Sequence, residues 1–339
     1  MSDWLPSAPC TPEACVSELV PAVPVLRRVL RCVVLAAVLA VGLVLAPLLA
    51  GPGPDGSRKS GRPAASGAPE RGMPDERLMR GWSRLLVAAL GVRIRAVGPP
   101  RTIPVPPATG RGRGALLVAN HVSWLDVLLI GAVRPGRMLA KSEVRGWPLF
   151  GRLAAGIGTI FIERDRLRAL PRTVEQIAAA LRRGEHVVVF PEGSTWCGRD
   201  GGRFRHAAFQ AALEAGAPVQ PMTIRYRLAG GEPTTVPAFV GEDGLLTSLW
   251  RVAGVRGLIA ELTLLPEIPA DRHPDRRSLA RAAQTSVQSR HTHTHPRLHR
   301  HRPDLVRAAV GLPVPVPVPV PVPAPASPRW AARSALARR

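Results

Sequence analysis

Short apolar runs alternate with helical patterns between residues 115 and 265, and this alternation constrains the fold more than any other feature. The apolar runs, which we interpret as strands, cover residues 115–119, 158–162, 186–190, 219–226 and 258–265. The helical patterns cover residues 123–132, 147–155, 170–183 and 206–215. Strands separated by helices favour a sheet whose faces those helices cover. The sequence therefore predicts an α/β fold with a mostly parallel or mixed central sheet flanked by helices.

An uncharged apolar segment near the N-terminus is long enough to cross a membrane. Residues 32–50 are 19 residues without a charge, and as a helix they extend about 29 Å, close to the roughly 30 Å of a bilayer's hydrocarbon core. We predict a transmembrane helix over residues 26–50 after a disordered lead over residues 1–25. A cleaved signal peptide is the alternative, but Glu13, Glu18 and the length of the apolar run argue against it.

Composition divides the rest of the chain. Residues 51–77 are rich in Gly, Pro and Ser and predict a linker. Residues 78–97 interleave apolar and basic side chains, which fits a helix in the membrane interface and equally a helix packed on the core. We expect one folded domain over residues 78–270. Residues 271–339, with scattered histidines and alternating Pro and Val, predict a basic disordered tail.

The chain is strongly basic. Its formal net charge is +22, and about +10 of this lies in the predicted tail, which holds 13 Arg and 3 acidic residues. An excess of positive charge favours anionic partners such as phosphates, acidic lipids or nucleic acid. Aromatic residues make up only 4% of the chain, which disfavours base stacking, so we expect membrane lipids and no nucleic acid as partners.

The cysteines and histidines give no sign of a metal site. Cys10, Cys15, Cys32 and Cys197 lack the spacing of a zinc site or a disulfide framework. The tail histidines lack partner ligands at a fixed spacing. We therefore expect no metal and no cofactor, and a domain that faces the reducing cytoplasm.

The polar residues 120–126 lie where a predicted buried strand ends and a helix begins. His121 can take up a proton near neutral pH, and Asp126 can hold the imidazole in the tautomer that leaves its other nitrogen free as a base. Reactive groups of α/β folds gather at this edge of the sheet. The pair could also be no more than a satisfied helix cap, so this segment alone does not decide between the two interpretations.

Two further polar segments follow predicted strands. The strand at residues 158–162 is followed by Glu163 and Arg164, and a guanidinium suits a phosphate, although an ion pair with a neighbouring acid explains Arg164 equally simply. After the next strand, proline and then glycine turn the chain, which presents Glu192 at the same sheet edge. Arg205, at the start of the following helix, is a candidate to hold an anion.

The sequence offers no enzyme nucleophile. It has no Gly-x-Ser-x-Gly elbow, and no cysteine has an activating histidine nearby in the sequence. The residues therefore favour a direct reaction, in which His121 removes the proton from a substrate hydroxyl as that oxygen attacks an activated acyl carbonyl. Asp126 would stabilise the imidazolium that forms.

Four segments of the sequence, in their order along the chain, resemble the motifs of the 1-acylglycerol-3-phosphate (lysophosphatidic acid) acyltransferase family. They are H-x4-D at residues 121–126, G-x-x-F-I-x-R at 158–164, F-P-E-G-S at 190–194 and P-V-Q-P at 218–221. Each motif is weak alone, but four in order make a specific signal. The resemblance covers residues 78–270.

The resemblance implies a membrane enzyme of phospholipid biosynthesis. It would transfer a fatty acyl group from acyl-CoA or acyl carrier protein to the free sn-2 hydroxyl of 1-acylglycerol-3-phosphate, giving phosphatidic acid. It implies His121 as base and Asp126 as its partner. The substrate-binding residues that we expect are Arg164, Glu192, Gly193, Ser194, Thr195 and Arg205. The family more often has E-G-T, and here Ser194 precedes Thr195, which keeps a hydroxyl in place.

Two alternatives remain open from the sequence. The acceptor could be another lysolipid such as lyso-ornithine lipid, because its carboxylate also suits arginine. From a different class, the chain could be a basic, non-enzymatic protein that binds membranes or nucleic acid.

Overall fold

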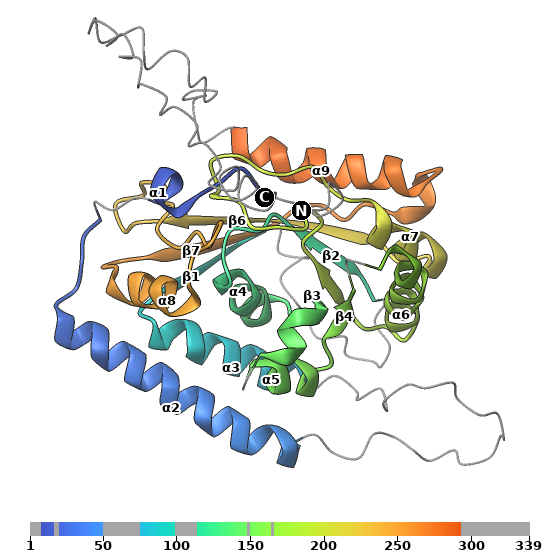
Figure 1. Cartoon of the computed structure of the whole chain (residues 1–339). Helices are drawn as coiled ribbons and strands as arrows, with labels where there is room; N and C mark the ends of the chain where they lie inside the picture. The colour runs from blue at the N-terminus through green and yellow to red at the C-terminus, as the bar shows by residue number, and fades with distance from the viewer. Residues whose placement is uncertain are drawn as a thin grey trace, which may run out of the picture. The chain divides into compact units, whose positions relative to one another are not determined.

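The computed structural model describes residues 8–16, 20–49, 75–98, 114–147, 150–163 and 166–292, and a seven-stranded sheet forms its centre (Figure 1). The strands are β1 (Arg93–Val97), β2 (Leu116–Ala119), β3 (Arg137–Lys141), β4 (Ile160–Ile162), β5 (Val187–Val189), β6 (Val219–Arg227) and β7 (Ile259–Leu264). Their order in the sheet is β1-β7-β6-β2-β5-β3-β4. All neighbours pair in parallel except β6 and β7, which are antiparallel. The structure confirms the prediction of a mixed α/β sheet.

Helices cover both faces of this sheet (Figure 1). The described α-helices are α1 (Pro12–Cys15), α2 (Val25–Leu49), α3 (Glu76–Ala89), α4 (Leu125–Val133), α5 (Phe150–Gly156), α6 (Leu170–Arg182), α7 (Ala207–Ala215), α8 (Leu245–Gly254) and α9 (Arg276–Thr292). Side chains of α2, α3, α4 and α8 share one core cluster, and those of α6, α7 and α9 share the other. In β2, Leu117 belongs to the first cluster and Leu116 and Val118 to the second, as the two-residue period of a strand requires.

The strands β1 and β3 and the helix α8 escaped the sequence analysis. The strands β1 and β3 are short, and exposed or charged side chains interrupt their apolar pattern. The helix predicted over residues 78–97 is wrong in its second half, because α3 ends at Ala89 and the chain turns at Gly91, whose φ is 73°, into β1. Helix α8 covers the sheet beside α3, in a region left unassigned by the sequence.

The predicted boundary at residue 270 is also wrong. A short 3₁₀ helix (Ala270–Arg272) and α9 continue the fold to Thr292. Leu279, Ala283 and Val287 of α9 are buried in the second core cluster. The arginine-rich, weakly apolar sequence of α9 conceals this narrow buried stripe, because one apolar residue per turn suffices to cover the sheet. The remainder of the predicted tail, and the predicted linker up to residue 74, lie outside the described residues.

Shortening a buried side chain of α9 should destabilise the whole domain. Leu279 is 0% exposed, so we expect Leu279→Ala to lower the free energy of unfolding by about 2–5 kcal/mol, from lost burial and the cavity left behind. Leu246→Ala is the matched control, because Leu246 is 80% exposed and its loss should change stability by no more than about 0.5 kcal/mol. Thermal unfolding of both proteins in detergent gives the comparison. Equal melting temperatures would contradict the placement of α9 in the core.

The N-terminal part of the chain is more ordered than the predicted lead. Residues 8–16 include α1, and Cys10 and Val23 are buried. One described helix, α2, is long and apolar enough over Val25–Leu45 to span a membrane, judged by length and composition. Its Arg31 guanidinium donates hydrogen bonds to the carbonyls of Ala253 and Val255, at 2.8 and 2.9 Å, which anchors the start of α2 on the end of α8.

Candidate active site

The site begins where β2 ends, in the middle of the sheet. The Asn120 side chain donates to the Ile224 carbonyl and accepts from the Ile224 amide, at 3.0 and 2.8 Å. The buried side-chain amide of Asn120 thus pairs with Ile224 as a neighbouring backbone would, and it fixes the end of β2 against β6. Since β2, β5 and β6 are mutually parallel, the residues that follow them meet at one edge of the sheet.

Asp126 and Phe190 fix the orientation of the His121 ring. Its Nδ1 lies 2.9 Å from Asp126 Oδ2, so the carboxylate selects the tautomer with the proton on Nδ1. The ring stacks on Phe190, with centroids 3.9 Å apart and planes 12° from parallel. The side chain remains 20% exposed, and no hydrogen bond from the described residues occupies Nε2. The free nitrogen can therefore accept a proton from a bound hydroxyl.

Asp126 is a fully buried carboxylate with a full set of donors. Besides His121, its Oδ2 accepts the backbone amides of Val122 and Ser123, at 2.7 and 2.9 Å. Its Oδ1 accepts the Tyr226 hydroxyl at 2.6 Å. Asp126 also lies in the first turn of α4, where the helix dipole favours negative charge. These contacts compensate for burying the charge and fix the carboxylate in place.

Tyr226 is a positioning residue that sequence reasoning missed. It is the only tyrosine of the chain and stands 100 residues after Asp126, near the end of β6. Burial chiefly, with the charge and hydrogen bond of Asp126, raises its pKa well above the usual value, so the hydroxyl stays protonated and donates. The available signal was its place at the end of a strand that we expected in the same sheet as residues 115–119.

Glu192 reaches the His121 turn from the end of β5. Its Oε2 accepts the His121 amide at 2.9 Å, and its Oε1 accepts the Gly202 amide at 3.2 Å. The side chain is buried, and burial raises its pKa to about 8, with a further rise from Asp126 and an opposing effect of the two amides. Both oxygens bind backbone, so the carboxyl ties the His121 turn to the loop after β5. Gly193, with a φ of 79°, allows the turn that brings Glu192 there.

The same loop is tied to the site by further hydrogen bonds. The Trp196 amide donates to the His121 carbonyl at 2.8 Å. The Thr195 hydroxyl donates to the Phe239 carbonyl, and the Phe239 amide donates to the Val122 carbonyl at 2.9 Å. The His121 turn therefore has loops on two sides, and its position depends on both.

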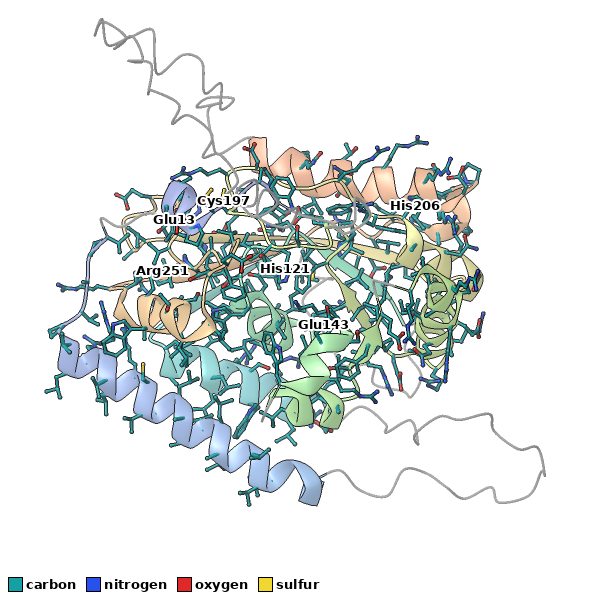
Figure 2. All side chains as sticks on the ribbon, in the orientation of Figure 1. Glu13, His121, Glu143, Cys197, His206 and Arg251 are labelled. Atoms are coloured by element: carbon teal, nitrogen blue, oxygen red, sulfur yellow. The ribbon has the colours of Figure 1, made fainter. Side chains whose placement is uncertain are left out.

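The other predicted substrate-binding residues lie less directly at the site. Ser194 Oγ is buried without a hydrogen-bond partner in the described part of the chain, which leaves it free for a ligand. The Arg205 amide donates to the Pro191 carbonyl at 2.8 Å, and its side chain is exposed. Figure 2 shows the next residue, His206, well apart from His121. Arg164 lies outside the described residues, so its predicted role in binding phosphate stays a prediction.

This arrangement can perform general-base chemistry on a hydroxyl. A buried anion orients a partly exposed imidazole, whose free nitrogen takes a proton while the anion stabilises the resulting charge. Among the described residues, no serine or cysteine is hydrogen-bonded to His121 as a nucleophile would be. The geometry therefore fits direct attack of a substrate hydroxyl.

Comparison with known proteins places these residues in a family. A family model described as Acyltransferase matches residues 100–225. A 1-acyl-sn-glycerol-3-phosphate acyltransferase from Neisseria gonorrhoeae is 34% identical over 183 residues, which cover 54% of this chain and 71% of the relative. A lyso-ornithine lipid O-acyltransferase from Pseudomonas aeruginosa is 39% identical over 265 residues, 78% of this chain and 93% of the relative. The chain belongs to the lysophosphatidic acid and lysolipid acyltransferase family.

The fold of this acyltransferase agrees with the family. The crystal structure of the 1-acyl-sn-glycerophosphate (LPA) acyltransferase PlsC from Thermotoga maritima matches it with a TM-score of 0.50 at 19% identity, over 66% of this chain and 81% of that chain. At this identity the likeness concerns the fold alone. The stretch matched by the family model contains His121, Asp126 and Glu192 and ends one residue before Tyr226. The resemblance seen in the sequence is thus confirmed.

The contacts of Glu192 give a prediction that separates positioning from substrate binding. We expect Glu192→Gln to lower kcat of this acyltransferase about 10- to 100-fold, with the KM for the lysolipid changed by less than about threefold. Glutamine has the size of glutamate, but its NH₂ group is a donor and cannot accept the hydrogen bond of a backbone N–H. One of the two backbone amides therefore loses its acceptor, and the His121 turn shifts. Glu214→Gln on exposed α7 surface is the matched control and should leave both constants unchanged. A raised KM with an unchanged kcat would instead place Glu192 on the acceptor.

Proposed function

We propose that the chain acylates the free hydroxyl of a lysolipid whose headgroup carries a carboxylate or a phosphate, with a fatty acyl thioester as donor. The observation that carries this is the His121 imidazole, held by buried Asp126 with its Nε2 free. Nε2 takes the hydroxyl proton as the oxygen attacks the thioester carbonyl. The tetrahedral intermediate then expels the thiolate, which takes the proton from the imidazolium. One ester forms, one thioester breaks, and His121 returns to its starting state.

For the acceptor we propose lyso-ornithine lipid first and 1-acylglycerol-3-phosphate second. The relative that is aligned over 93% of its own length is a lyso-ornithine lipid O-acyltransferase. The second candidate is the acceptor implied by the sequence motifs, and relatives with that name share 34% identity over 71% of their length. Each headgroup carries an anionic group, a carboxylate in the first lipid and a phosphate in the second, so the basic character of the chain supports either.

We also propose that the enzyme binds the cell membrane, with its catalytic domain facing the cytoplasm. Large apolar side chains are exposed on three neighbouring helices, α2, α3 and α8. They are Val25, Leu26, Val29, Leu30, Val33, Val34, Val41, Val44, Leu45, Leu78, Leu85, Leu246 and Trp250. Such a surface is unfavourable in water and suits the membrane, where the lipid acceptors lie.

A product assay tests the proposed reaction. Membranes that contain the full chain are incubated with labelled acyl-CoA or acyl carrier protein thioester and, separately, with lyso-ornithine lipid, 1-acylglycerol-3-phosphate or lysophosphatidylcholine. We expect mass spectrometry to find diacylated ornithine lipid, with a kcat/KM at least about tenfold above that for 1-acylglycerol-3-phosphate, a discrimination of about 1.4 kcal/mol. Matched membranes with His121→Ala give the background.

The outcomes separate the candidates. Higher kcat/KM for 1-acylglycerol-3-phosphate would exchange the two acceptors and leave the chemistry intact. Transfer to lysophosphatidylcholine alone would contradict both proposed acceptors. No His121-dependent product from any lysolipid would contradict the proposed function.

A further inference from the structure

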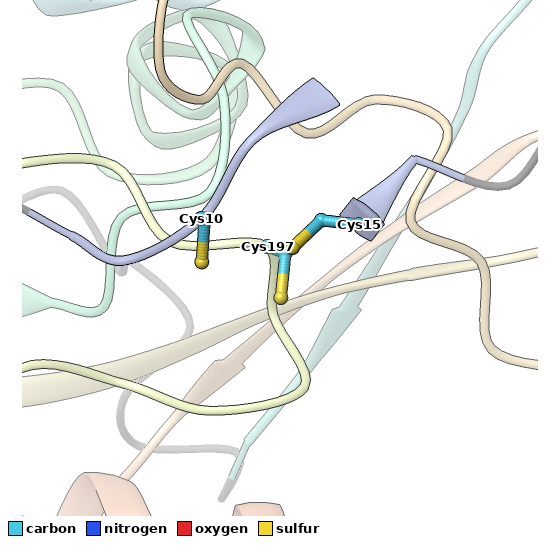
Figure 3. Close-up of side chains that lie close together, drawn as sticks. All are labelled: Cys10, Cys15 and Cys197. Atoms are coloured by element: carbon cyan, nitrogen blue, oxygen red, sulfur yellow. The ribbon is translucent and has the colours of Figure 1, made fainter. Parts of the chain in front are cut away.

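Three of the four cysteines come together in the fold, although the sequence separates them widely. Cys10 and Cys15 belong to the N-terminal segment around α1, and Cys197 belongs to the loop after β5 (Figure 3). Their three sulfur atoms all lie within 4.8 Å of one another. Cys10 and Cys197 are buried, and Cys15 is half-buried.

Burial and backbone hydrogen bonds act in opposite directions on the thiols of Cys10 and Cys15. A backbone hydrogen bond from Cys197 reaches the Cys10 thiol, and one from Thr11 reaches the Cys15 thiol; each lowers the pKa of the sulfur that it contacts. Burial outweighs them and raises the pKa of Cys10 to about 12. The group that holds the three sulfurs contains no carboxylate and no imidazole. The raised pKa values of Cys10 and Cys15 favour their neutral thiols, and a bound cation would favour their thiolates instead.

The arrangement matches a metal site better than a disulfide. With a metal–sulfur bond of about 2.3 Å, thiolates around one ion stand roughly 3.8–4.0 Å apart, so small side-chain rotations would suffice here. A disulfide would draw two sulfurs to about 2.05 Å and leave the third thiol over. Soft thiolate ligands select soft d¹⁰ ions.

We propose that Cys10, Cys15 and Cys197 together bind one thiophilic d¹⁰ cation, Zn²⁺ or Cu⁺. Each thiol gives up its proton and donates a lone pair, so the ion replaces three protons and no redox change occurs. Three thiolates complete a trigonal site for Cu⁺, whereas Zn²⁺ keeps one position for a small exogenous ligand.

The site would connect the N-terminal segment to the loop after β5, which contacts the His121 turn. Cys197 follows Trp196, whose amide donates to the His121 carbonyl at 2.8 Å. On the other side, Cys10 and Thr11 lie against the turn at Gly241, two residues after Phe239. An ion at the three sulfurs would therefore fix both loops that hold the His121 turn. In this proposal the ion acts on structure and takes no part in the acyl transfer.

Metal binding by the full chain tests this proposal, with Cys32→Ser as the matched control because Cys32 lies on α2, outside the cluster. Protein in detergent is reduced, stripped with a chelator and titrated with Zn²⁺, with Cu⁺ under anaerobic conditions, and with Co²⁺ as a spectroscopic probe. We expect about one ion per chain, a thiolate-to-cobalt charge-transfer band, and protection of three thiols from a thiol reagent.

Single substitutions locate the ligands. Cys10→Ser, Cys15→Ser and Cys197→Ser should each weaken binding at least about 100-fold, more than the loss of an outer-shell partner typically costs. Cys32→Ser should bind as the unmodified chain does. Circular dichroism checks folding, and Cys10→Ser and Cys15→Ser remain informative if Cys197→Ser misfolds.

Three results would overturn the proposal. They are no tight binding of either ion, equal binding by Cys10→Ser, and a disulfide within the cluster in protein alkylated at harvest.

Discussion

Replacing His121 by alanine should lower kcat about 10²- to 10⁴-fold, the usual contribution of a positioned base. In the proposed mechanism, His121 Nε2 is the atom that accepts the proton of the lysolipid hydroxyl. The ring is 20% exposed at the edge of the sheet, so its removal leaves only a small cavity and should change the melting temperature little. Steady-state rates of lysolipid acylation and a thermal melt, measured on the same preparation, check both statements.

His273→Ala provides the control for a histidine with a partner. His273 is half-buried and its Nδ1 contacts the Ser278 hydroxyl at 3.0 Å, next to α9. It should retain full activity. Turnover by His121→Ala within about tenfold of the unmodified chain would remove His121 as the base. If His121→Ala lost membrane binding or folding, its lower rate would reflect the damaged structure and not the loss of the base.

Replacing Asp126 by asparagine should be comparably severe, with a loss in kcat of about 10²- to 10⁴-fold. If the amide oxygen takes the Oδ2 position, the hydrogen bonds survive but the charge that stabilises the imidazolium is lost. If the NH₂ takes that position, it opposes two backbone amides and forces the other imidazole tautomer. In that orientation each unsatisfied buried amide costs about 1–3 kcal/mol, so the melting temperature should fall as well.

Tyr226→Phe is the variant with which the loss in kcat of Asp126→Asn is compared. It removes one donor from Asp126 Oδ1 and leaves the charge and the contact with His121, so its loss in kcat should be clearly smaller than that of Asp126→Asn. Measuring kcat and the melting temperature of both variants separates orientation from charge. Equal losses would show that the hydroxyl, through its hold on the carboxylate, matters as much as the charge. An Asp126→Asn enzyme with near-normal kcat would contradict the role of the carboxylate.

The two predictions depend on the strand order. Strand β2 lies between β5 and β6, so the residues after its end meet Glu192 from one side and Tyr226 from the other. This is why a base, its carboxylate partner, and the groups that position both can share one small region although the chain brings them together from three strands.

Local patterns were enough for the sequence to determine the fold class and the family, and to point to the proposed base. Apolar runs and helical periods are properties of neighbouring residues, and they predicted most of the inner strands and the helices between them. His121 and Asp126 are five residues apart across one strand-to-helix turn, so their contact at 2.9 Å is short-range. The four motifs carried the family because their order along the chain is itself sequence information.

Tertiary structure alone decided the rest, because it depends on contacts between distant residues. Tyr226 meets Asp126 across 100 positions, and both oxygens of Glu192 are taken by backbone amides that no side-chain pattern encodes. The stripe that holds α9 to the sheet is hidden among arginines. Cys197 joins Cys10 and Cys15 only when the loop after β5 folds against the N-terminal segment. Linear spacing cannot reveal a proposed ligand set that the fold assembles from the N-terminal segment and the middle of the domain.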